Sequence, residues 1–380
     1  MTSVSSIQTR ILDVPPSCIE VCPWDQTIFA VGTYLLHKEE HTDELGQPES
    51  ADESNHPQKR TGTVELFRLS EDQSSFEHLR HCWCDYAILD LHFPILHDQA
   101  NPCLWTANST GSLTRHSLDA SNTAIEKSVL VQVEEPHVLV LSFTFHPTDS
   151  RLLGVTLSDG CVAVVQIPPA DAPGEKISAT TIYKHDLEAW TMSFDLKTQR
   201  CLSGGDDAVI QCSALNSELN PGSDIQQAEP VALWKNRKLH FAGVTAILPL
   251  EDDLMVTGSY DDHLRVLSIS KPPKMLADVN LEGGVWRLKL LNSREHERTR
   301  HYDILASCMH AGTRIVRVTI QEGAAPQIDI RCKFEEHESM NYGSDFVRAK
   351  TNPCDYTILS TSFYDKRLCL WNFRGPPPET

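Results

Sequence analysis

A short turn rich in Gly, Ser and Asp returns along this chain at nearly constant spacing, and each time it precedes a run of alternating apolar residues. Successive turns lie 49, 49, 48, 54, 50 and 54 residues apart, measured between Thr61, Thr110, Asp159, Asp207, Asp261, Ala311 and Asp365. Repeats of about 40 to 50 residues built from short strands are typical of β-propeller blades. The spacing therefore predicts an all-β chain folded as a seven-bladed β-propeller.

The repeats also predict where the blades lie. They are expected within one domain, 1–380, at about 15–70, 80–120, 137–168, 183–215, 239–270, 283–320 and 337–373. The last unit ends after three strand-like runs, while the N-terminus has a spare one at 9–14. We therefore predict that strand 9–14 is the outer strand of the last blade and closes the ring, since closure removes an open sheet edge. The segment 37–60 is acidic and polar and contains two prolines, so a disordered insertion is expected there.

Charge and hydropathy limit the partners. The chain has 33 basic and 52 acidic residues, a formal net charge of −19, which argues against direct nucleic-acid binding and favours a basic partner. Residues 1–10 are polar and lack the apolar segment of a secretory signal. No apolar run approaches the roughly 20 residues of a membrane-spanning helix. We expect a cytoplasmic monomer that does not bind membranes.

The twelve cysteines are scattered singly, and such residues mostly behave as small buried apolar side chains in a cytosolic protein. Cys82-Trp83-Cys84 and Cys308-Met309-His310 come closest to a zinc-ligand spacing, but either would need ligands from elsewhere in the fold. We therefore expect no metal site and no cofactor.

Unusual residues gather in loops and turns that a propeller places on one face. Three histidines precede inner strands and three aspartates occupy turns of the same units, giving the pairs His185 with Asp207, His240 with Asp261, and His337 with Asp365. A structural hydrogen bond within the blade is the plainer interpretation of each pair. The neighbouring carboxylates Asp206 and Asp262 are less easily explained in this way, and Asp206 is expected to face the channel.

Five aromatic residues lie beside the same turns, either packed between blades or exposed at the rim: Trp190, Tyr260, Trp286, Tyr342 and Tyr364. Mixed with Glu188, Asp206 and Asp262, an aromatic group of this kind would suit a quaternary ammonium or another soft cation. Each cation–π contact contributes roughly 0.5–2 kcal/mol.

Motifs for common hydrolases are absent. The chain has no Gly-x-Ser-x-Gly nucleophile elbow, no His-Glu-x-x-His and no phosphate-binding glycine loop with Lys. The motifs alone therefore favour an interaction scaffold.

An ordered set of motifs nevertheless resembles one enzyme family, the WD-repeat diphthine methyl esterases (diphthine methyltransferase family) of the diphthamide pathway. The resemblance spans about 15–371, is densest after His185, and lacks most of the Trp-Asp dipeptides that name WD repeats. The motifs are His185-x-x-Glu-Ala-Trp190, Ser203-Gly-Gly-Asp-Asp207, Thr257-Gly-Ser-Tyr-Asp261, Gly283-Gly-Val-Trp-Arg-Leu-Lys289, Cys308-Met-His-x-Gly312, Tyr342-Gly and Ser362-Phe-Tyr-Asp365.

This resemblance implies a hydrolase that removes the methyl group of diphthine methyl ester on translation elongation factor 2, giving diphthine and methanol. Without a serine elbow, we expect water attack assisted by a histidine base. His310 is the first candidate because it replaces the usual turn residue, and His185 or His337 could serve instead. Glu188 and Arg287 complete the candidate catalytic set. Arg287 is expected either to polarise the ester carbonyl or to serve as a surface residue or salt-bridge partner. The alternative is a non-enzymatic scaffold that uses the same face to bind a basic or methylated peptide or a trafficking complex.

Overall fold

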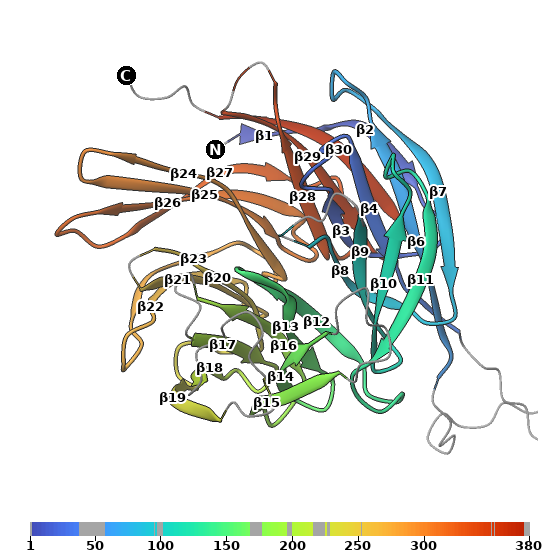
Figure 1. Ribbon diagram of the computed structural model, residues 1–380. Coiled ribbons are helices and arrows are strands. Elements are labelled where there is room, and N and C mark those ends of the chain that lie inside the picture. The colour runs from blue at the N-terminus through green and yellow to red at the C-terminus, as the bar shows by residue number, and fades with distance from the viewer. Residues whose placement is uncertain are drawn as a thin grey trace, which may run out of the picture.

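Seven sheets follow one another along the chain and stand in a ring, which confirms the seven-bladed β-propeller (Figure 1). The computed structural model describes residues 2–37, 58–94, 96, 102–167, 177–195, 200–215, 225, 229–251, 253–350, 352 and 354–375. Most of the predicted insertion 37–60 lies outside these residues. Within them, no helix has the length and apolar character needed to cross a bilayer.

The first three blades are each built around four strands. Blade 1 contains β3 (Pro16–Val21), β4 (Ile28–Thr33), the short β5 (Leu35–Leu36), β6 (Arg60–Leu69) and β7 (Phe76–Cys84). Blade 2 contains β8 (Ile88–His92), β9 (Cys103–Asn108), β10 (Ser112–Leu118) and β11 (Ile125–Gln132). Blade 3 contains β12 (Val140–His146), β13 (Asp149–Leu157), β14 (Cys161–Gln166) and β15 (Ser178–Lys184).

The remaining blades repeat this pattern. Blade 4 contains β16 (Ala189–Phe194), β17 (Arg200–Gly205), β18 (Ile210–Leu215) and β19 (Pro230–Asn236), and blade 5 contains β20 (Val244–Pro249), β21 (Leu254–Ser259), β22 (His263–Ser268) and β23 (Met275–Asn280). Blade 6 contains β24 (Arg287–His296), β25 (Thr299–Ser307), β26 (Thr313–Gln321) and β27 (Gln327–Phe334), joined by the parallel β1 (Thr2–Ser3). Blade 7 contains β28 (Gly343–Arg348), β29 (Asp355–Ser362), β30 (Arg367–Arg374) and β2 (Ser6–Ile11).

The first strand of each blade contacts that of the next, in the order β3, β8, β12, β16, β20, β24, β28 and back to β3. These strands therefore surround the ring axis. Apolar side chains on both faces of each sheet pack against the neighbouring blades, because a blade is covered on both sides. In the part of the chain that the structure describes, buried side chains accordingly form seven clusters, one at each interface between blades. Between blades 6 and 7, for example, the rings of Phe334 and Trp371 stack with centroids 5.0 Å apart.

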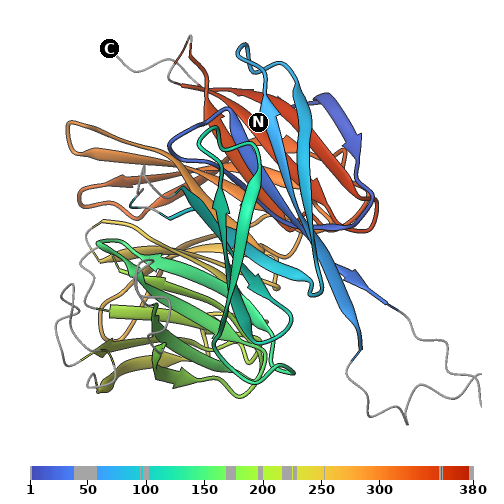
Figure 2. The same ribbon diagram turned by 45° about the vertical axis from the view of Figure 1, so that its right-hand side comes forward.

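The N-terminal strand β2 lies beside β30, its antiparallel partner, so blade 7 combines the two ends of the chain (Figures 1 and 2). This strand begins and ends three residues before the expected range 9–14. That the pairing closes the ring remains a prediction.

The outer strands of blades 1 to 6 lie beyond the blade ranges expected from sequence. β7 belongs to blade 1 although blade 2 was expected to begin at 80, and β11 follows the expected end of blade 2 at 120. Outer strands are hard to identify because they are mostly exposed, so their sequences lack a strong apolar alternation. In β11 only Ile125 and Val131 are partly covered.

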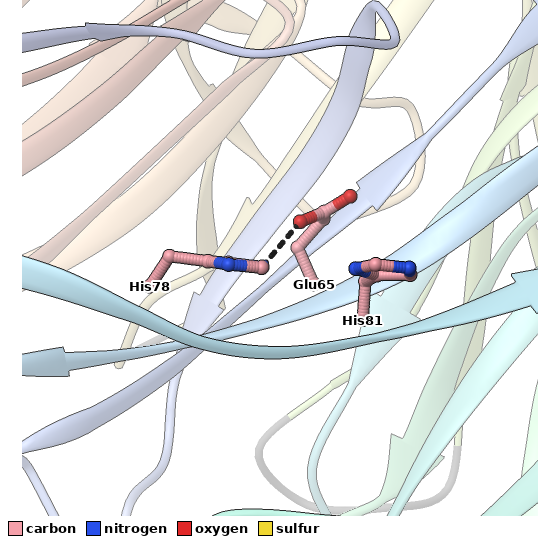
Figure 3. Close-up of side chains that lie close together, drawn as sticks. All are labelled: Glu65, His78 and His81. Atoms are coloured by element: carbon pink, nitrogen blue, oxygen red, sulfur yellow. Dashed lines mark ion pairs between the residues drawn. The ribbon is translucent and has the colours of Figure 1, made fainter.

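The two outer strands of blade 1 contain a β-bulge. β6 and β7 pair in register except at Leu79, an extra residue between the pairs Leu66 with Arg80 and Phe67 with His78. A bulge of this kind reverses the alternation of side chains along one strand. It places His78 and His81 on the same face as Glu65, where Figure 3 shows them together.

Candidate functional site

Four aromatic residues predicted from the sequence meet in one group, here called the aromatic cluster: Trp190, Tyr260, Trp286 and Tyr342. The ring of Trp286 lies at its centre, with centroid distances of 5.4 Å to Trp190, 5.9 Å to Tyr260 and 5.1 Å to Tyr342. Trp190 also contacts Tyr260 edge to face at 6.1 Å. All four residues are half-buried, so each side chain packs partly against the protein and is partly accessible to solvent.

The members come from four consecutive blades. Trp190 lies in β16 of blade 4, Tyr260 directly follows β21 of blade 5, and Trp286 and Tyr342 directly precede β24 and β28 of blades 6 and 7. The strands fix these positions, because each residue lies in a hydrogen-bonded strand or next to the end of one. The backbone N–H of Tyr260, for example, donates to the carbonyl of Gly243 at 2.9 Å.

The row of rings continues past the predicted set. Phe363 contacts Tyr342 at 5.5 Å and Tyr364 at 5.0 Å, and Tyr34 of blade 1 contacts Phe363 at 6.1 Å. Tyr364, a predicted site residue, is 70% exposed, and its ring contacts that of Phe363, which in turn contacts Tyr342. Sequence reasoning missed Tyr34 because it lies beside the insertion in blade 1, which repeat spacing does not link to blade 7.

Two carboxylates edge the cluster. The Asp206 side chain accepts a hydrogen bond from the indole N–H of Trp190 at 3.0 Å, and its backbone N–H donates to the Glu188 carbonyl at 2.8 Å. Burial, followed by the charges of Tyr342, Asp206 and Glu188, raises the pKa of Tyr260, whereas Arg287 lowers it. Asp206 and Glu188 therefore act electrostatically on the cluster.

Asp262 does not join these carboxylates. It adopts a left-handed backbone conformation with φ of 66°, and no hydrogen bond or ion pair links its side chain to the cluster within the described residues. Its charge instead acts on Cys308, whose thiol pKa is raised to about 12, first by burial. The charge effect on Cys308 places Asp262 near blade 6, and a role for Asp262 in binding substrate stays a prediction.

Gly243, which has no side chain, lets Asp206 and Tyr260 approach each other. A Cβ atom at Gly243 would lie 2.6 Å from Asp206 Oδ1 and 2.9 Å from Tyr260 Cδ2, closer than such atoms can pack. Any other residue at Gly243 would push the carboxylate and the ring apart.

The histidines that precede inner strands are buried within their blades. His185 Nδ1 lies 3.0 Å from Asp207 Oδ1 and its Nε2 3.0 Å from Ser203 Oγ, which confirms the predicted pair. Burial lowers the pKa of His185. His337 contacts Ser360 Oγ through Nε2 at 2.9 Å, and burial lowers its pKa to about 4. Such sequestered rings are suited to holding loops, so we place His185 and His337 outside the reacting site.

Two of the predicted histidine–aspartate hydrogen bonds are replaced by others. His240 Nε2 bonds with Thr257 Oγ1 at 2.9 Å, while Asp261 pairs with Arg265 at 2.8 Å. Asp365 accepts from the backbone N–H of Glu338 at 3.0 Å, and no hydrogen bond to His337 is present among the described residues. In blade 5 the Asp261 carboxylate instead pairs with the buried Arg265, four residues further along the chain. The repeat pattern could not predict this pairing.

His310 has different surroundings. It is exposed, at the tip of the turn between β25 and β26. The neighbouring Met309 pairs with Asn341, which precedes Tyr342, and a Cβ at Gly284 would lie 2.7 Å from the Met309 sulfur. The turn that carries His310 therefore rests against the loops that carry Trp286 and Tyr342.

Arg287 connects the aromatic cluster to charges on the ring axis. Its guanidinium lies 4.8 Å from the centroid of the Trp286 ring and 3.8 Å from Asp90 Oδ2, and it donates to the carbonyls of Trp286 and Thr245 at 3.1 and 3.4 Å. Arg287 thus has one side against the cluster and the other against blade 2.

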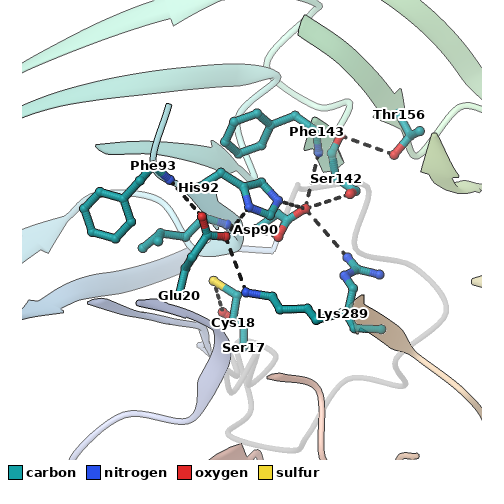
Figure 4. A network of polar contacts seen from close by, with 12 residues as sticks. Ser17, Cys18, Glu20, Asp90, His92, Phe93, Ser142, Phe143, Thr156 and Lys289 are labelled. Atoms are coloured by element: carbon teal, nitrogen blue, oxygen red, sulfur yellow. Dashed lines mark hydrogen bonds and ion pairs between the residues drawn. The ribbon is translucent and has the colours of Figure 1, made fainter. Parts of the chain in front are cut away.

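The axial network comes from four inner strands and consists of Glu20, Asp90, His92, Arg287, Lys289 and Asp345. Figure 4 labels four of its members, Glu20, Asp90, His92 and Lys289. His92 lies between the carboxylates of Glu20 and Asp90, and Lys289 Nζ is 2.7 Å from Asp345 Oδ2 and 3.6 Å from Glu20 Oε2. Burial alone would lower the pKa of His92, but Glu20 and Asp90 outweigh it and raise that pKa to about 10. His92 is therefore a charged donor at neutral pH and not a base.

Sequence reasoning missed this network except for Arg287. One signal was available, because residues two apart on a strand share a face. Asp90 and His92 on β8, and Arg287 and Lys289 on β24, are such pairs of charged residues in strands expected to line the axis.

Among the described residues, the side chains placed to share a metal ion are Glu65, His78 and His81 on the outer strands of blade 1. These strands belong to blade 1, whereas the aromatic cluster comes from blades 4 to 7.

Fold and site define a seven-bladed WD-repeat-type propeller with an acid-edged aromatic site built from four blades. Solved structures agree on the fold. The WD40 propeller of Doa1 matches with a TM-score of 0.59 at 13% identity, over 98% of this chain and 97% of that one. A chain of the mitotic checkpoint complex matches with a TM-score of 0.57 at 12% identity, over 96% and 93%.

Sequence relatives identify the family. Diphthine methyltransferase of Schizosaccharomyces pombe is 30% identical over 93% of this chain and 94% of its own length. The proteins of the same name from Saccharomyces cerevisiae and Homo sapiens are each 25% identical, over 97% and 91% of this chain and 97% and 75% of their own lengths. No protein-family model matches. The chain belongs to the diphthine methyltransferase family.

Proposed function

We propose that this chain acts in diphthamide biosynthesis by hydrolysing the methyl ester of diphthine methyl ester on translation elongation factor 2. Water would add to the ester carbonyl, the bond to the methoxy group would break, and methanol would leave, so that diphthine carries a free carboxylate. The names of the relatives support the pathway, and the aromatic cluster is the observation that carries the substrate assignment.

The aromatic cluster fits the trimethylammonium group of such a substrate. Three rings lie within 6 Å of Trp286, and a quaternary ammonium has no N–H to donate, so rings rather than hydrogen-bond acceptors must hold it. Asp206 and Glu188 add negative charge at the edge. A neutral peptide would gain nothing from these carboxylates.

The chemical step needs a base for water and a partner for the developing oxyanion. His310 is exposed beside the loops of the aromatic cluster and can act as the general base. Arg287, held by Asp90 and stacked on Trp286, can stabilise negative charge on the carbonyl oxygen. These two residues are the catalytic residues we propose. No part of this mechanism uses a metal or cofactor.

The protein substrate accounts for the charge of the chain. A net charge of −19 attracts a basic partner and speeds its encounter, and elongation factor 2 would supply such a surface. We propose that the chain meets it as a monomer in the cytoplasm.

Mass spectrometry of methylated elongation factor 2, incubated with the purified chain, tests the activity. We expect the loss of one CH₂ unit and the release of methanol. His310→Ala should slow this loss by at least about a hundredfold, in the range of general-base contributions, while His263→Ala should not. His263 is the matched control because it is a half-buried histidine near the turn of another blade, paired with Asp278 at 2.9 Å.

Two outcomes separate the claims. Full turnover by the His310→Ala protein would overturn the base assignment and leave the activity intact. Binding of the methylated factor without mass loss would overturn the hydrolase proposal and favour the scaffold.

A further inference from the structure

A carboxylate and two imidazoles converge on the outer strands of blade 1, where the proposed function has no use for them. Glu65 lies on β6, and His78 and His81 lie on β7. Their ligand atoms all lie within 4.8 Å of one another. Glu65 and His78 are half-buried and His81 is exposed, so the group can be reached from solvent.

The bulge at Leu79 creates this convergence. Residues three apart on a regular strand point to opposite faces of the sheet. Here Glu65 pairs with His81 and Phe67 pairs with His78, because Leu79 is left without a partner on β6. Bulges often redirect a side chain at a functional site, and this one brings both imidazoles to the face that carries Glu65.

The donor atoms are arranged as ligands would be. His78 Nε2 lies 2.7 Å from Glu65 Oε2, yet this nitrogen is buried and makes no hydrogen bond within the described residues. The other carboxylate oxygen, Oε1, accepts from Thr63 Oγ1 at 2.8 Å. Hydrogen bonds of this kind orient ligand side chains around metal ions, and this one leaves Oε2 facing the imidazoles.

We propose that Glu65, His78 and His81 bind a divalent transition-metal ion, with zinc the best fit. Two imidazoles and one carboxylate are a common zinc ligand set that leaves a fourth position for water. Calcium and magnesium prefer oxygen ligands throughout. Zn–N and Zn–O bonds of about 2.0–2.1 Å place neighbouring ligand atoms roughly 3.4 Å apart, which rotation of the exposed His81 ring can provide. The bound ion would join β6 to β7 and stabilise the outer edge of blade 1.

Calorimetric titration of the full chain with Zn²⁺, after chelator treatment and dialysis, tests the site. The expected result is one tight site per chain. Glu65→Gln and His81→Ala should each weaken it by more than about tenfold. His263→Ala should not, although His263 also pairs with a carboxylate, because no third ligand lies near it in the described chain. Circular dichroism would establish that each variant is folded.

A tryptophan beside the site reports where the ion binds. Trp83 is 62% exposed, and its ring lies 5.9 Å from that of His81. Cu²⁺ bound at His81 should quench the fluorescence of Trp83, and Trp83→Phe should remove that part of the quenching. Equal Zn²⁺ binding by the wild type and the Glu65→Gln and His81→Ala proteins, or quenching that Trp83→Phe leaves undiminished, would show adventitious binding only and overturn the proposal. Neither readout depends on ester hydrolysis.

Discussion

The stability of this protein depends on pH through single histidines whose pKa values are shifted in the folded chain. Burial first, and Arg265 second, lower the pKa of His240 to about 3, and burial lowers that of His337 to about 4. Both rings are neutral in the folded chain, and unfolding releases them to an ordinary pKa of about 6.5. Their contribution to stability is therefore complete above about pH 6.5 and is lost as the pH falls towards their folded values. His92, with its pKa raised to about 10, contributes below pH 6.5 and loses that contribution as the pH rises.

We accordingly predict that the free energy of unfolding has its maximum near pH 6.5. Between pH 6.5 and 5.5, His240 and His337 should each lower the free energy of unfolding by roughly 1 kcal/mol. On the alkaline side, His92 should lower it by roughly 1 kcal/mol per pH unit. The His92 value allows for the 28% of its side chain that stays exposed. Urea unfolding at several pH values measures this, and His92→Asn should flatten only the alkaline side. A flat profile from pH 5.5 to 8.5 would contradict these roles.

Single residues also show where reading the sequence succeeds. The aromatic residues could be located because each lies next to a repeated turn, and the repeat itself places those turns on one face. The axial network could not be located in the same way. Glu20, Lys289 and Asp345 lie on three separate strands, and only the ring arrangement brings Lys289 Nζ to 2.7 Å from Asp345 and 3.6 Å from Glu20.

The two ends of the chain meet in blade 7, where they supply neighbouring strands. β2 supplies the outer strand of blade 7, and Gln8 on β2 bonds with the backbone of Phe76 in blade 1 at 3.0 and 2.7 Å. These contacts tie the last blade to the first. Inner strands are buried on both faces and show their apolar pattern in the sequence. The outer strands of blades 1 to 6 lie beyond the expected blade ranges because their exposed faces carry little apolar pattern.

Removal of residues 1–11 should therefore destabilise the ring. The truncated chain would expose the edge of β30, and we expect a midpoint of thermal unfolding lowered by several degrees together with self-association through that edge. Removal of residues 1–4, which deletes only β1, is the control and should have a much smaller effect. Differential scanning calorimetry and light scattering measure both. An unchanged melting midpoint and a monomeric 1–11 deletion would show that β2 does not close the ring.

The whole ring is what assembles the proposed site. Trp190, Tyr260, Trp286 and Tyr342 come from four blades, and no two of them are neighbours in the sequence. The seven interfaces between blades hold these strand ends in fixed relation, so the cluster is present before any ligand arrives. The repeat spacing could predict the face but not the contacts, because ring-to-ring distances depend on how each blade packs on the next.

Recognition of a trimethylammonium group by the aromatic cluster is most directly tested by calorimetric titration with two elongation factor 2 peptides. One carries diphthine, which keeps the trimethylammonium group but has no ester to be consumed, and the other carries unmodified histidine. We predict clear binding of the diphthine peptide only. Trp286→Leu should weaken it by about tenfold, equivalent to a cation–π loss of about 1.4 kcal/mol, and Trp83→Leu, outside the cluster, should leave it unchanged. Equal binding of the two peptides, or full affinity in the Trp286→Leu protein, would contradict the assignment.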